Sequence, residues 1–263
     1  MPEFVQYLLF VGFAGLMFLL RLDARRFSAA EWDTEGGEWR VWLSRLSWYG
    51  AGLALGLLIF ALHPSPVADL NLDLAPDRGE ALIYGLVYGG AGIVVAFILP
   101  VLVNGRISFP RPSRYPGGVL MAVGTAFFDE FLFRGVLLGL LLTLDLPEWL
   151  AVAGAALIYA GAIRAGTGSR GILVLLVWLA IGLVGGVLVL ATAGIAAAFV
   201  GHAITRFALF MTMGQPEREA VAQAQPRTGG SGDAGAYVIA PRSYPPGTGE
   251  DDGRGGPGPV RPG

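Results

Sequence analysis

Cysteine and lysine are both missing from this sequence of 263 residues, in which all 18 basic residues are arginine. Without a thiol, the chain has no disulfide framework, no thiolate metal ligand and no cysteine nucleophile. Charged residues make up only 14% of the chain, and the formal net charge is −2. We therefore expect no nucleic-acid partner, because neither a basic stripe nor a positive net charge is present to attract one.

Apolar residues dominate the composition of the chain. They account for 54% of the chain, and the mean hydropathy is +0.60. Ordinary soluble domains are about 45–50% apolar and about 25% charged. The composition therefore indicates an integral membrane protein whose first partner is the lipid bilayer, and we predict a multi-pass protein of the cell membrane.

Seven stretches are apolar enough to cross a bilayer, which requires about 20 residues and tolerates about 17–25. They run approximately from Phe4 to Leu20, Ser47 to Leu62, Ala81 to Val103, Gly118 to Leu144, Trp149 to Ile163, Ile172 to Leu190 and Gly194 to Met213. The last two are separated near Ala191 to Gly194, because the apolar run from Ile172 is too long for a single crossing. The predicted fold class is thus an all-α, polytopic transmembrane helical bundle of about seven spans.

Arginine is distributed unevenly among the predicted loops. The loops after the first, third and fifth spans contain Arg21, Arg25, Arg26, Arg40, Arg45, Arg106, Arg111, Arg114, Arg164 and Arg170. The loops after the other spans contain only Arg78. Because basic residues are retained on the cytoplasmic side, this alternation predicts an N-terminus outside and a C-terminus in the cytoplasm.

We divide the chain into three parts. Residues 1–117 hold three spans with an interfacial loop, residues 118–213 form a core of four spans, and residues 214–263 are a disordered cytoplasmic tail rich in glycine and proline. In the first loop, apolar residues recur at helical spacing at Trp39, Trp42, Leu43 and Leu46. This pattern predicts an anchoring helix that lies in the interface, with a gate or a substrate platform as the alternative.

Charges inside spans are costly, at about 2.5 kcal/mol or more each, and so mark candidate functional residues. Asp129, Glu130 and Arg134 fall near the middle of the fourth span. Glu130 and Arg134 are four residues apart and share a helix face, so that they can pair, whereas Asp129 projects about 100° away. Pairing one acid leaves the other available to take and return a proton.

The seventh span contributes His202 and, one turn later, Arg206. A histidine that faces an acid on another helix is a candidate catalytic pair, because both side chains exchange protons. Arg206 is also able to pair with Asp129 and neutralise it. The alternative is that all these charged side chains form a buried polar network that only fixes helix packing.

The string from Asp129 to Gly135 resembles the first motif of the CPBP family of intramembrane proteases, also called CAAX-processing or Abi proteins. In that motif, two adjacent glutamates are followed after three residues by arginine, and here Asp129 replaces the first glutamate with a shorter carboxylate. A second family motif has an aromatic residue with histidine four positions later, and here Tyr159 is followed by Ile163 instead. The third motif, a histidine with a polar residue four positions later, resembles His202 with Arg206.

The resemblance covers roughly residues 118–213 and implies a helical membrane fold with a polar cavity open to the cytoplasmic side. In the family, a glutamate and two histidines activate water to hydrolyse a peptide bond near the C-terminus of a prenylated protein or in peptide maturation. Carried over, Asp129 or Glu130 is the base, His202 polarises water or stabilises the oxyanion, and Arg134 orients the acid. We expect no metal and no cofactor. Catalytic zinc usually has three protein ligands, whereas the predicted interior contains one histidine and two acids.

Three functions remain open at this point. The first is an endopeptidase that acts on a peptide or membrane-protein substrate through Asp129, Glu130, Arg134 and His202. The second is a catalytically degenerate relative that binds a peptide or another membrane protein, which the loss of histidine at Ile163 favours. The third is a transporter that uses Asp129 and His202 as a proton relay, although the sequence shows no inverted repeat.

Overall fold

The structure is a computed structural model that describes residues 3–24, 26–27, 29, 39–110, 112–167 and 171–213. Across these ranges the regular structure is helical, apart from single β-bridges at Leu74–Gly194 and Ser108–Met213. The predicted all-α fold is confirmed. The predicted tail, residues 214–263, lies outside the described residues.

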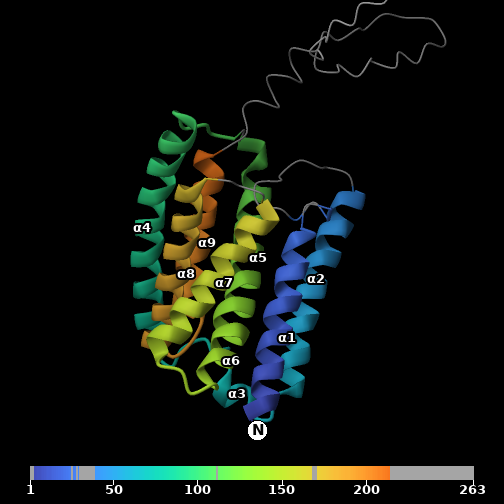
Figure 1. Ribbon diagram of the computed structural model, residues 1–263. Helices are drawn as coiled ribbons and strands as arrows, with labels where there is room; N and C mark the ends of the chain where they lie inside the picture. The colour runs from blue at the N-terminus through green and yellow to red at the C-terminus, as the bar shows by residue number, and fades with distance from the viewer. Residues whose placement is uncertain are drawn as a thin grey trace, which may run out of the picture. The chain divides into compact units, whose positions relative to one another are not determined.

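The helices follow the predicted spans closely (Figure 1). They are α1 (Glu3–Leu22), α2 (Trp39–Leu62), α3 (Pro66–Asp69), α4 (Arg78–Asn104), α5 (Tyr115–Asp129), α6 (Leu138–Leu142), α7 (Glu148–Thr167), α8 (Ile172–Thr192) and α9 (Ala196–Thr212). A short 3₁₀ turn, Pro112–Arg114, precedes α5, and a π-helical segment, Glu130–Leu137, joins α5 to α6 in one continuous rod. This rod is the predicted fourth span.

Five of these helices are long and apolar enough to cross a membrane by length and composition. They are Phe4–Leu22, Trp39–Leu62, Arg78–Asn104, Glu148–Ala165 and Ile172–Thr192. Helix α9 is apolar but shorter, and the rod from α5 to α6 contains the charged residues of the candidate site. These lengths suit a bilayer environment, whereas the orientation of the helices in it stays a prediction.

The break between the last two predicted spans is confirmed at residues 193–195. Ala193 ends α8 in the left-handed region, with φ 51°, and Ile195 N donates to Asp73 O at 2.8 Å. A Cβ on Gly194 would lie 2.9 Å from Ala75 Cα, so only glycine permits this approach to the loop after α3. The chain therefore reverses here and starts α9 beside α8.

Two predictions for the first loop are corrected by the structure. Trp39 to Leu46 do not form a separate interfacial helix but are the first turns of α2, because no proline or glycine interrupts the helical pattern before Gly50. Arg21 and Arg45, which we assigned to this loop, lie inside α1 and α2 and are buried, each 4% exposed. Arg40 also belongs to the first turn of α2.

Glycines on α4 allow α9 to pack closely against it. A Cβ on Gly85 would lie 2.9 Å from Ala197 O, and one on Gly89 would lie 2.7 Å from Ile204 Cδ1. Such small residues at four-residue spacing are typical of close helix contacts in membranes. Helix α9 also contacts α5 and α8 (Figure 1).

Candidate functional site

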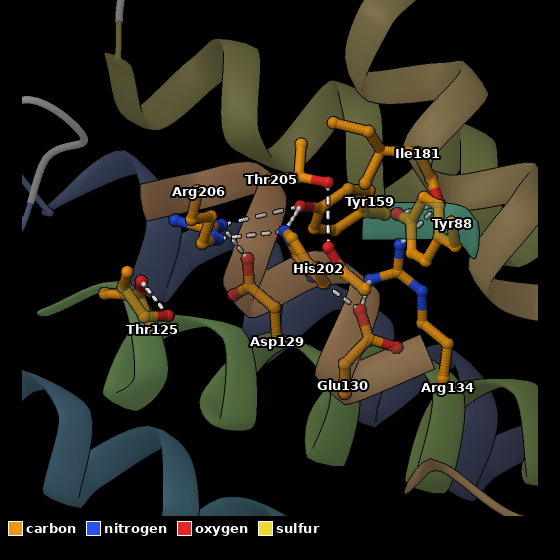
Figure 2. Close-up of polar contacts among 12 residues, drawn as sticks. Tyr88, Thr125, Asp129, Glu130, Arg134, Tyr159, Ile181, His202, Thr205 and Arg206 are labelled. Atoms are coloured by element: carbon orange, nitrogen blue, oxygen red, sulfur yellow. Dashed lines mark hydrogen bonds and ion pairs between the residues drawn. The ribbon is translucent and has the colours of Figure 1, made fainter. Parts of the chain in front are cut away.

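The four residues predicted from sequence to form the site are brought together in the protein interior (Figure 2). Asp129 ends α5 and Glu130 begins the π-helical segment, on which Arg134 lies one turn further. His202 faces them from α9, and all four are 2% exposed or less. Short π-helical segments are frequent at functional sites, and this one carries both Glu130 and Arg134. We call these four residues, with Arg21, Tyr159 and Arg206, the buried polar cluster.

Glu130 and His202 contact each other directly across the cluster. His202 Nδ1 lies 2.6 Å from Glu130 Oε1, and Arg134 Nη1 lies 3.3 Å from the same oxygen. The other carboxylate oxygen, Oε2, has no hydrogen-bond partner among the described residues. Glu130 is therefore held through one oxygen while the second is buried and unused.

The contacts of His202 define its tautomer. Arg206 Nε donates to His202 Nε2 at 2.9 Å, and arginine has donors only, so Nε2 is the acceptor. The proton of a neutral imidazole then lies on Nδ1 and is donated to Glu130 Oε1. Tyr159 Oη lies 3.3 Å from Nε2 and adds a second polar group on this side of the ring.

Asp129 is bound on both sides. Arg21 Nη2 donates to Oδ1, and Arg206 Nη2 donates to Oδ2, both in short contacts (Figure 2 shows the Arg206 contact). The sequence pointed to a contact between Asp129 and Arg206 but not to Arg21. No local signal marks Arg21, because its partner is 108 residues away in the chain.

Aromatic rings lie against Arg21 and Arg134, the two arginines of the cluster that are not on α9. The Arg21 guanidinium lies 5.1 Å from the ring centroid of Trp48 and 5.6 Å from that of Phe128. Arg134 lies 4.1 Å from the Tyr159 ring centroid and donates to Ile181 O at 3.2 Å. Arg134 thus fixes the rod to α7 and α8 as well as pairing with Glu130.

Ile163 occupies the position at which the family motif has its second histidine. It lies on α7, one turn after Tyr159, and is 1% exposed within the hydrophobic core. Its side chain has no polar atom, so this side of the cluster offers no second imidazole. Tyr159, the other residue of that motif, does contact His202.

The donor set does not suit a metal ion. In the described part of the chain, no group of three or more histidine and acidic side chains is placed to hold one. Both carboxylate oxygens of Asp129 accept hydrogen bonds from arginines, and both ring nitrogens of His202 are hydrogen-bonded to neighbouring side chains. What the arrangement offers is a carboxylate with one unused oxygen beside a neutral imidazole.

Comparison with known families identifies the segment that contains the cluster. Residues 111–208 match the model of the family described as type II CAAX prenyl endopeptidase Rce1-like. The match includes every member of the cluster except Arg21. Among curated proteins, no match to the chain was found. The match supports the resemblance predicted from the motifs, and residues 111–208 are similar to CAAX-type membrane proteases of the CPBP family.

Proposed function

We propose that this chain is a membrane-embedded endopeptidase of the CAAX-processing type, in which Glu130 and His202 activate a water molecule to hydrolyse a peptide bond. One observation carries the proposal: the carboxylate of Glu130 is fixed by His202 and Arg134 through Oε1, while Oε2 is buried without a partner. A buried polar atom left unsatisfied costs about 1–3 kcal/mol. A general base needs a carboxylate oxygen that no other group already binds, and Oε2 meets this requirement.

In this proposal, each member of the pair has a distinct role. A water bound at Oε2 gives its proton to Glu130, and its oxygen bonds to the carbonyl carbon of the peptide. When the C–N bond breaks, the same proton passes from Glu130 to the leaving amine. Because Nε2 of His202 is an acceptor in this tautomer, His202 serves to hold Glu130, and the donors available to the oxyanion are Tyr159 and Arg206.

We interpret the arrangement of Arg206 as the closed state of the proposed site. Arg206 occupies His202 Nε2 and one oxygen of Asp129, and at 9% exposure it is the most exposed member of the cluster. Movement of its side chain would open the cluster at a tolerable cost, since Asp129 would keep its contact with Arg21. In this proposal, Arg206 moves before a substrate binds.

A second candidate is a family member that has lost catalysis and binds a peptide or another membrane protein. Two specific observations favour it. Both oxygens of Asp129 are neutralised by arginines, and Ile163 replaces an expected histidine with an apolar side chain. These features remove two of the groups that the family resemblance implies for catalysis.

The test is cleavage of a panel of membrane-tethered and prenylated peptides by the detergent-purified protein. We expect turnover by the wild type and a loss of about 100-fold or more in kcat for Glu130→Gln, because a general base contributes about 10²–10⁴-fold. The glutamine retains an oxygen that accepts from His202 Nδ1, so the fold is preserved. Glu148→Gln, an exposed position at the start of α7, is the matched control and should behave as the wild type.

The opposite outcome separates the two candidates. No turnover by the wild type, with turnover gained in the double variant Ile163→His and Arg206→Asn, would support the non-catalytic candidate. Unfolding in detergent, followed by circular dichroism, confirms in each case that the variant remains folded.

A further inference from the structure

Tyr88 lies on α4 beside the buried polar cluster, although it falls outside the residues that match the family model. Its side chain is buried. The hydroxyl and the ring make separate contacts, and each of these contacts ends on a group that precedes or anchors a partner of Glu130. The proposed activation of water makes no use of Tyr88, so these two contacts still require a function.

The hydroxyl of Tyr88 shares its acceptor with Arg134 (Figure 2). Tyr88 Oη donates to Ile181 O at 3.4 Å, and Arg134 Nη2 donates to the same carbonyl oxygen at 3.2 Å. Gly185 lies one turn later on α8 and leaves room for this guanidinium, since a Cβ there would lie 3.1 Å from Arg134 Nε. The Tyr88 hydroxyl therefore helps to fix the carbonyl that orients Arg134, and Arg134 pairs with Glu130 Oε1.

The ring of Tyr88 packs against the backbone of α9 immediately before His202. A Cβ on Gly201 would lie 2.6 Å from Tyr88 Cγ, so the ring occupies the space that a larger residue would need. Packing this close restricts movement of α9 at His202, because a well-packed interior transmits displacements. Tyr88 thus supports both groups that contact Glu130 Oε1, namely His202 through its ring and Arg134 through its hydroxyl.

The direction of the second oxygen of Glu130 depends on these two supports. His202 and Arg134 contact Oε1, whereas Oε2 has no hydrogen-bond partner among the described residues. A general base must point its oxygen at the attacking water, and a misplacement of about 1 Å can cost about 100-fold in rate. A residue that fixes both partners of Oε1 therefore also fixes where Oε2 points.

We propose that Tyr88 is a positioning residue for the hydrolysis: it holds His202 and Arg134 in place and thereby directs Glu130 Oε2 at the attacking water. The inference rests on the proposed function and extends the site to α4, outside the matched residues 111–208. Tyr88 does not bind the substrate in this proposal. Its loss should therefore lower kcat and leave KM unchanged.

The first readout is the kinetics of peptide cleavage. Tyr88→Phe keeps the ring, and it should lower kcat by about three- to tenfold, the effect of one lost hydrogen bond. Tyr88→Leu loses both contacts and should lower kcat by about 100-fold. Tyr84→Phe, one turn earlier on α4 and 42% exposed, is the matched control and should keep the wild-type kcat. A rise in KM at unchanged kcat would overturn the inference, because Tyr88 would then contact the substrate.

The second readout is the nuclear magnetic resonance signal of the His202 imidazole, which requires no turnover. The chain has only two histidines, so isotopically labelled histidine gives two imidazole signals in detergent, and His63→Gln assigns them. In folded Tyr88→Phe, the Nδ1 proton of His202 should exchange with solvent about three- to tenfold faster, because the support of Glu130 is weakened. The increase should be larger in Tyr88→Leu and absent in Tyr84→Phe.

The two readouts keep this inference separate from the proposed function. Exchange at the wild-type rate in both folded Tyr88 variants would overturn the positioning role of Tyr88, whether or not the wild type cleaves a peptide. Faster exchange in these variants, with no turnover by the wild type, would support the positioning of His202 and contradict only the proposed hydrolysis.

Discussion

Asp129 shares its charge between two arginines that come from opposite ends of the sequence. Arg21 on α1 and Arg206 on α9 each take one carboxylate oxygen, and all three side chains are buried. Removing all partners from a buried charge costs about 3–5 kcal/mol, more than breaking one of several hydrogen bonds. If Arg206 moves, Asp129 therefore keeps one cationic partner, Arg21.

This arrangement predicts strong non-additivity between Arg21 and Arg206. Arg21→Gln and Arg206→Gln should each lower the free energy of unfolding by about 1–3 kcal/mol. The double variant should lose more than the sum of the two, because Asp129 is then a buried charge without a cation. Denaturant unfolding in detergent micelles measures all three values.

An exposed arginine provides the control for this cycle. Arg40→Gln should change the free energy of unfolding by about 0.5 kcal/mol or less, since it is exposed. Strictly additive losses for Arg21 and Arg206 would mean that the two arginines stabilise Asp129 independently, and would remove the basis for a movable Arg206.

At the scale of helices, the position of His202 depends on how closely α9 approaches α4. The glycines of α4 permit this approach, and Gly92 continues the series by facing Thr205, on the same face of α9 as His202 one turn earlier. The Thr205 hydroxyl donates within α9 to Gly201 O at 2.8 Å. The α4–α9 contact therefore positions the histidine relative to the acids on the rod.

Neighbouring glycines on α4 test this dependence. Gly89→Leu should lower the free energy of unfolding by about 1–3 kcal/mol, because its side chain would overlap Ile204, and should also reduce cleavage. Gly90→Leu is the matched control, since no atom lies within 4 Å of its Cβ position and the residue is exposed. Equal effects of the two substitutions on unfolding would contradict the role of close packing.

The sequence predicted the helices well but predicted contacts between distant helices poorly. The length of the apolar stretches located each long helix and the reversal before α9. This works because a bilayer requires helical segments and limits the length of each one. The π-helical segment had no signal in the sequence, and neither did the burial of Arg21. Their cause is tertiary: Trp48 and Phe128 form an aromatic site for Arg21 only after α1, α2 and α5 have packed.

The candidate site was predictable to the extent that its residues fall in motifs. Asp129, Glu130, Arg134 and His202 converge as expected, since charges in apolar spans must face one another. The sequence did not predict which of the two acids keeps an oxygen without a partner. The spacing of Glu130 and Arg134 indicated an ion pair, which would have left Asp129 as the unpaired acid. In the structure, Asp129 has no available oxygen, and Glu130 retains one.

At the scale of the whole molecule, the orientation of the helices in the bilayer is predicted from the arginine distribution. The C-terminal ends of α1, α4 and α9 lie at one end of the bundle, which the arginine distribution predicts to be cytoplasmic (Figure 1). The proposed function then requires a path from that side of the membrane to the buried polar cluster.

The absence of cysteine makes this orientation directly testable. Asp77→Cys and Arg106→Cys place single thiols at exposed positions at the two ends of α4. In intact cells, a membrane-impermeant maleimide should label the cysteine at position 77 and should label that at position 106 only after permeabilisation. The reverse pattern would place the N-terminus in the cytoplasm and contradict the predicted orientation.

The most direct test of the account is hydrolysis in water enriched in heavy oxygen, with products analysed by mass spectrometry. The wild type should release a peptide whose new C-terminal carboxylate carries one heavy oxygen, and folded Glu130→Gln should release almost none. Equal product from wild type and Glu130→Gln would contradict the assignment of Glu130 as the base. No product from a folded wild type across the peptide panel would contradict the proposed hydrolysis itself.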